Sequence, residues 1–111
     1  MAVTVRQGAA NGVYIRTFYF ERAGDANEQH VHTYDHLMLV SHGAVKVEVS
    51  GEASEYRAPH IVGVAAHHQH RVVALEDGSV ITCFVHVPGV KEIILDDDQI
   101  PAGIRRDFFG R

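Results

Sequence analysis

Nine histidines lie in the middle of the 111-residue chain, between positions 30 and 86. His30 and His32 are one residue apart, so on a β-strand both point to the same face. His36 has the same parity, and His70 closes a polar turn just before another β-type segment. Imidazole is a ligand for zinc, copper, nickel and iron. We therefore expect His30, His32, His36 and His70 to bind one divalent transition-metal ion.

A site made of four neutral imidazoles leaves the +2 charge of the ion uncompensated. In an interior of low dielectric, such a charge attracts an anionic ligand or lowers the pKa of a bound water. Structural zinc sites usually contain cysteine thiolates, and Cys83 is the only cysteine of this chain. The pattern therefore favours chemistry or anion binding over a purely structural metal.

The elements that must position these histidines are short β-type segments separated by turns. Residues 44–49 alternate apolar and charged side chains, which predicts a half-buried strand with Val45, Val47 and Val49 facing inward. Strands at intervals of about ten residues indicate an all-β sandwich or barrel. The predicted strands are 13–20, 37–40, 44–49, 61–65, 71–75 and 79–87, with 91–95 as one further candidate.

The spacing of the histidines resembles the two sequence motifs of the cupin superfamily. Gly24, His30-Val31-His32, His36 and Gly43 follow the order and spacing of the first motif, and residues 62–74 align with the second without a gap. The resemblance covers about residues 12–90. It implies a single cupin domain over residues 1–111, folded as a jelly-roll or double-stranded β-helix barrel with its core at about 12–90. A C-terminal tail, 96–111, is expected to dock on the barrel.

Four positions depart from the family pattern. His36 replaces the acidic ligand of the first motif, and Ala65, His67 and Ala74 replace the Pro, Gly and Asn of the second. Some cupins are similar to this chain in having four histidines at the ligand positions, and the resemblance implies that His36 completes the site. The alternative is an open site of three histidines with water in the fourth position.

Three further residues are candidates for the wall of the site, with no catalytic residue assigned. Tyr34 lies between predicted ligands and is either packed or able to donate a hydrogen bond to a ligand. His68 belongs to the turn before His70, and His86 lies on the last long predicted strand, facing either the cavity or solvent. For each of these residues, the non-functional alternative is a side chain that is solvated or packed against its neighbours.

The composition excludes several classes of function. Apolar residues make up 46% and charged residues 22% of the chain, and the net charge is −4, which argues against nucleic-acid and membrane partners. One cysteine permits no intrachain disulfide, and a cytoplasmic location is expected. The resemblance also implies a homodimer in which an edge strand crosses to the partner.

Two functions remain open at this point. The first is a metalloenzyme acting on a small oxygen-rich or anionic molecule, dioxygenase-like with iron or copper, or isomerase- or lyase-like with zinc, nickel or manganese. The second is a metal-dependent sensor or binding protein without turnover. A third interpretation makes the histidines a pH-sensitive structural cluster.

Overall fold

The structure is a computed structural model that describes residues 3–27, 30–31 and 33–110. These ranges contain the strands and two short helical segments. The elements are β1 (Val3–Ala10), β2 (Val13–Phe20), β3 (His30–Val31), β4 (His36–His42), β5 (Ala44–Val49), β6 (Glu52–Arg57), β7 (His60–Val64), β8 (Gln69–Ala74), β9 (Ser79–His86), η1 (Asp97–Gln99) and α1 (Arg105–Phe109).

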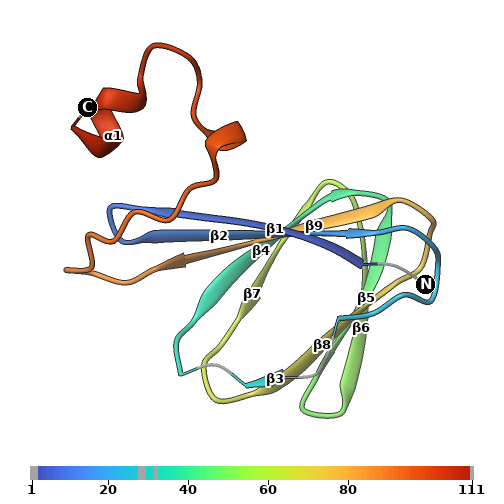
Figure 1. The fold of residues 1–111 in the computed structure, drawn as a ribbon. Helices are drawn as coiled ribbons and strands as arrows, with labels where there is room; N and C mark the ends of the chain where they lie inside the picture. Colours follow the sequence, from blue (N-terminus) through green and yellow to red (C-terminus); the bar gives the residue numbers. More distant parts are fainter. Residues whose placement is uncertain (1–2, 28–29, 32, 111) are drawn as a thin grey trace.

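The strands form two antiparallel sheets that face each other across one core (Figure 1). One sheet has the strand order β1-β2-β9-β4-β7, and the other has the order β3-β8-β5-β6. Strands that are neighbours in a sheet are often distant in sequence, because the chain passes repeatedly from one sheet to the other. This is the jelly-roll arrangement, and it confirms the predicted all-β fold class.

The core lies between the sheets because successive residues of a strand point to opposite faces. Phe20, Val40 and Ile81 of the five-stranded sheet are fully buried. From the other sheet, Val45 and Val47 are buried against them, and Val49 packs on the same cluster. The alternation of residues 44–49 therefore has the orientation that the sequence predicts.

Two strands were not predicted from the sequence. β1 ends in Gln7-Gly8-Ala9-Ala10, and β6 is rich in glutamate, so neither has the β-branched and aromatic composition of a typical strand. Each is a strand because it pairs along its length with a stronger neighbour, β2 or β5. The candidate strand at 91–95 contributes an isolated bridge between Ala9 and Ile94.

A tight turn at Gly43 joins β4 to β5 and fixes both to the start of β9. Gly43 has φ of +74°, and a Cβ there would lie 2.4 Å from the Ser79 hydroxyl oxygen. That hydroxyl is fully buried, donates to the Glu76 carbonyl at 2.8 Å, and accepts the Ala44 N–H at 3.2 Å. The glycine of the first motif thus allows a close approach between the two strands.

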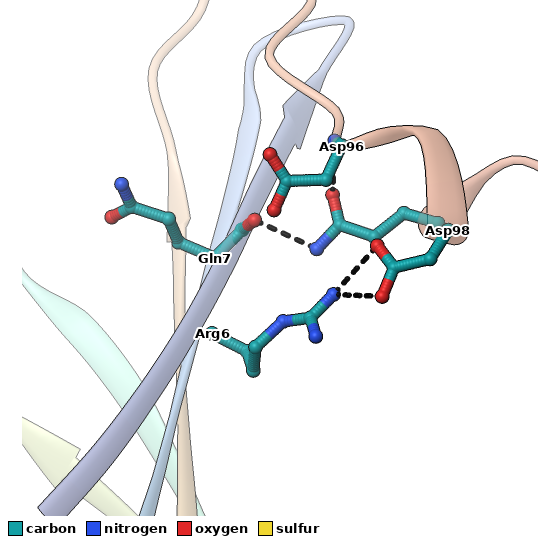
Figure 2. A network of polar contacts seen from close by, with 5 residues as sticks. Arg6, Gln7, Asp96 and Asp98 are labelled. Atoms are coloured by element: carbon teal, nitrogen blue, oxygen red, sulfur yellow. Dashed lines mark hydrogen bonds and ion pairs between the residues drawn. The ribbon is translucent and has the colours of Figure 1, made fainter.

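The C-terminal segment contacts β1 through polar groups (Figure 2). The Arg6 guanidinium donates to both carboxylate oxygens of Asp98 at 2.8 Å, and the Gln99 amide donates to the Gln7 carbonyl at 2.8 Å. The Asp98 carboxylate raises the pKa of Arg6. Residues 94–99 therefore lie along the barrel, whereas α1 stands apart from the two sheets (Figure 1). No helix among the described residues is long and apolar enough to cross a membrane.

Candidate metal and ligand site

Two of the predicted ligands, His36 and His70, meet inside the barrel from opposite sheets. His36 begins β4 and His70 lies in β8, and their exposed fractions are 7% and 4%. Their ring centroids are 5.1 Å apart, with the ring planes inclined by 48°. Residues 34 positions apart in sequence thus place two imidazoles side by side in the interior.

Local sequence explains why both rings are buried. In β4, His36 alternates with exposed Leu37 and shares its buried face with Met38. Before β8, His67 has φ of +67°, the left-handed conformation that a glycine adopts readily. His67 therefore takes the backbone conformation expected of the family's glycine. The turn before His70 is formed in spite of that substitution.

The other two predicted ligands fall at the limit of the described chain. β3 pairs with β8 so that His30 is the Cα partner of His70, and the two positions share one face of the four-stranded sheet. The side chain of His30, and His32 as a whole, lie outside the described residues. Among the residues that are described, no three His, Cys, Asp or Glu side chains are grouped closely enough to hold a metal.

The His36–His70 pair fits a shared metal ion. Two imidazoles that bind one ion at about 2.0–2.1 Å, at a right or tetrahedral angle, have ring centroids about 4.6–5.3 Å apart. The separation of 5.1 Å lies in that range. Neutral nitrogen donors suit transition metals rather than magnesium or calcium. The donor chemistry of the described residues therefore fits the ion that the family resemblance implies.

A cavity of about 410 Å³ opens beside the two histidines. Apolar side chains from both sheets make up much of its wall, including Phe18, Met38 and Val72. A volume of this size suits a small molecule. Cys83 also lines the cavity, and burial raises the pKa of its thiol to about 11. Without a bound ion, that thiol keeps its proton at neutral pH.

Arg16 is a polar feature of this cavity that was not predicted from the sequence. It lies on β2 with the same parity as Phe18, and it lines the same wall as the two histidines. The guanidinium donates a hydrogen bond to the Gln7 side-chain oxygen at 3.2 Å. The available signal was a cation in a largely apolar strand, but β2 has large apolar residues on both faces, so the sequence does not show which face points inward.

The three candidate wall residues have different positions. Tyr34 lines the cavity, with its ring edge-on to His36 at a centroid distance of 6.4 Å. His68 is exposed, and its Nδ1 lies 2.9 Å from the Ser50 hydroxyl. His86 is also exposed, and it alternates with Val85 and Val87, which do line the cavity. His68 and His86 are not among the described lining residues.

No protein-family model matches the sequence, and no curated protein is similar to it. Solved structures do share its fold. KdgF from Halomonas sp. superposes with a TM-score of 0.67 at 23% identity, covering 88% of this chain and 84% of that one. A cupin superfamily protein from Desulfitobacterium hafniense has a TM-score of 0.68 at 16% identity over 78% of this chain and 79% of its own.

A third solved structure shares the fold. It is an RmlC-like cupin with a double-stranded β-helix fold from Methanocaldococcus jannaschii, with a TM-score of 0.69 at 12% identity, covering 77% of this chain and 80% of that one. Two facing antiparallel sheets with a polar site between them define the class as a double-stranded β-helix barrel. Within that class the chain has the cupin fold, which confirms the resemblance at the level of fold.

Proposed function

We propose that this protein binds one divalent transition-metal ion through His30, His32, His36 and His70 and uses it on a small anionic molecule. The main observation in support is the pair of buried imidazoles on the wall of the cavity. They come from opposite sheets, and their ring centroids are 5.1 Å apart. The register that makes His30 the partner of His70 supports including position 30. We also propose a cytoplasmic location, because the chain has one cysteine and its thiol stays reduced there.

The chemistry of the cavity favours an anionic ligand. Arg16 is the cationic side chain on a wall that is otherwise mostly apolar. A guanidinium binds carboxylates and phosphates through paired, charge-assisted hydrogen bonds. We therefore assign Arg16 to the acidic group of the ligand and the histidine end of the cavity to its reacting oxygens.

The bound ion would polarise a carboxylate, an enolate or vicinal oxygens of the ligand. The protein's own part is orientation and exclusion of water. Arg16 fixes one end of the ligand, and Phe18, Met38 and Val72 keep the other end dry. Tyr34 stands beside His36, where its hydroxyl can donate a hydrogen bond to a ligand oxygen.

Two outcomes of such binding are possible, and they differ in turnover. With iron or copper the site suits dioxygenase-like chemistry, and with zinc, nickel or manganese it suits an isomerase or lyase. A binding or sensor protein without turnover is favoured by a specific observation. The described lining of the cavity contains no aspartate or glutamate to act as a general base.

Elemental analysis of untagged protein tests the metal site. We expect about one ion per chain in the native protein, and loss of that ion in His36→Ala and His70→Ala. His42→Ala is the matched control, because His42 is exposed in the described barrel. Metal retained by His36→Ala and lost by His70→Ala would define an open three-histidine site. Full metal content in both ligand variants would refute the proposal.

Reconstitution separates enzyme from binding protein. Protein loaded with iron, copper, zinc, nickel or manganese is tested for oxygen uptake with diketones, flavonols and thiols, and for isomerisation or elimination of hydroxy acids. Turnover that disappears in His70→Ala and is reduced in Arg16→Met indicates an enzyme. Tight binding of a carboxylate without turnover indicates the binding function.

A further inference from the structure

The free edge of β1 is covered by a segment that follows the barrel in sequence. β1 is the outermost strand of the five-stranded sheet, and such a strand has N–H and C=O groups without a partner strand. Ala9 and Ile94 exchange two backbone hydrogen bonds, each of 2.8 Å. The Gln7 carbonyl accepts a hydrogen bond of 2.8 Å from the Gln99 amide (Figure 2). We call residues 94–99 the strap, because they lie along this edge.

The strap is also part of the wall of the cavity. Ile94 lines the cavity together with Gln7 and Ala9 of β1, the two residues to which the strap is hydrogen-bonded. Val87, which follows the end of β9, lines it as well. On this side, the wall is therefore complete only while the strap lies against β1.

The side of the cavity that the strap closes is the one with Arg16. Gln7 and Arg16 are Cα partners in β1 and β2. The Gln7 side-chain oxygen accepts a hydrogen bond from the Arg16 guanidinium at 3.2 Å, and the Gln7 carbonyl accepts the one from Gln99. One residue thus contacts both the strap and the cationic group of the cavity. The strap lies next to the end that the proposed function assigns to the acidic group of the ligand.

The contacts that hold the strap are few and exposed to water. The side chains of Arg6 and Asp98, which form its ion pair, are 52% and 63% exposed, and exposed ion pairs contribute little stability. None of residues 94–99 is buried, and Ile94 is 44% exposed. Segments with few buried apolar contacts and exposed hydrogen bonds open at a low cost in free energy. The strap is therefore expected to detach far more often than the barrel unfolds.

Most of the remaining wall cannot move in this way. β2, β4, β8 and β9 supply most of the lining residues, and each of these strands has a partner strand on both sides. Moving one of them would break ladder hydrogen bonds within a sheet. The backbone pairing of the strap is limited to the isolated bridge between Ala9 and Ile94. Its release therefore leaves both sheets intact.

We propose that the strap is a gate, which closes the cavity beside Arg16 when it is bound to β1 and admits the ligand when it is released. α1, which follows the strap, stands apart from the two sheets and has no buried residue (Figure 1). It can therefore move with the strap at no cost to the core. The role in ligand exchange rests on the proposed function, whereas the release of the strap is a property of the fold alone.

Cys83 reports on the gate, because it is the only cysteine of the chain and lines the cavity. The full-length protein is treated with N-ethylmaleimide, a neutral thiol reagent, and the labelling rate is followed by mass spectrometry at constant pH. When opening and closing are fast, this rate follows the open population. Arg6→Asp and Asp98→Arg should each raise it about three- to tenfold, since repulsion replaces an exposed ion pair. The double variant restores the pair and should return to within about twofold of the native rate.

Arg57→Asp is the matched control, because it reverses the charge of another exposed ion pair, with Glu76, that does not involve the strap. Its labelling rate should equal the native rate. Equal rates in the native protein and Arg6→Asp, no rescue in the double variant, or the same acceleration in the control would overturn the proposal. So would a native protein labelled as fast as the urea-unfolded chain. Metal analysis of the same samples keeps the two proposals apart, because a native protein without metal contradicts the metal site while the labelling rates still test the gate.

Discussion

Gly43→Ala should destabilise the protein strongly, because two separate costs meet at that residue. An alanine held at φ of +74° pays the left-handed penalty of about 1–2 kcal/mol. Its Cβ would stand 2.4 Å from the Ser79 Oγ, a distance that real contacts do not show. The hydroxyl must move, and the buried Ala44 N–H then loses its acceptor, which costs about 1–3 kcal/mol. The expected total is about 2–5 kcal/mol.

Ser79→Ala probes the second cost alone. Removing the hydroxyl leaves the Ala44 N–H unpaired but introduces no clash, so we expect about 1–3 kcal/mol. In the double variant the alanine at position 43 no longer meets the oxygen, although the Ser79 Cα at 3.0 Å remains close. The effects should therefore not add. A coupling energy of about 1–2 kcal/mol is expected, within the range found for residues in contact.

Urea unfolding of the four proteins, followed by circular dichroism at constant pH, measures this cycle. Ser54→Ala, at an exposed position of β6, controls for a generic serine effect and should change stability by less than about 0.5 kcal/mol. The reasoning is refuted if Gly43→Ala costs under 1 kcal/mol, or if the two single effects add without coupling. The first result would mean that the turn relaxes freely, and the second that the hydroxyl and the glycine act independently.

Three shorter predictions concern the cavity and the tail. Arg16→Met should weaken the binding of a carboxylate ligand at least tenfold in calorimetry, with metal content unchanged. Arg16→Lys keeps the charge and should lose less affinity. Equal affinity in the native protein and both variants would exclude the assigned role. Burial raises the pKa of Cys83 from 9.0 to about 11. The stability that the buried, protonated thiol contributes to the fold is therefore fully present below pH 9 and disappears as the pH rises toward 11. Between pH 9 and pH 11, the free energy of unfolding measured in urea should therefore fall by up to about 2–3 kcal/mol more in the native protein than in Cys83→Ala. Parallel pH profiles of the two proteins would contradict this. Arg6→Gln should leave the melting temperature nearly unchanged, since exposed ion pairs contribute little to stability. Trypsin should cleave after Arg105 faster in this variant. An unchanged cleavage rate would show that the Asp98 contact does not restrain the tail.

Several strands could be predicted from the sequence because their composition and their environment agree. Residues 13–20 and 44–49 are strands with the predicted bounds, since β-branched and aromatic residues suit a pleated surface. β1 and β6 could not be predicted in this way. Their stability comes from pairing with β2 and β5, a tertiary effect that local composition does not reveal.

The candidate site was predictable in its residue types more than in its positions. His36 was expected at the start of the apolar run 37–40, and it does begin β4, but the sequence did not indicate that this strand lies in the other sheet from β3. The pairing of His36 with His70 comes from the packing of the two sheets. Arg16 could not be assigned to the cavity, because choosing the inward parity of β2 requires knowing what packs on each face.

Apart from Arg16 and Thr17, β2 is apolar on both of its faces. A strand that is buried on one face alternates, whereas a strand covered on both faces reads as a nearly continuous apolar run. β4 has the same property and presents His36 to the cavity and Leu37 to the outward side of the sheet. Neighbouring positions of one strand therefore have separate roles. His36→Ala should lower the metal content of the protein, whereas Leu37→Ala should leave it unchanged, and equal metal loss in both variants would contradict this separation.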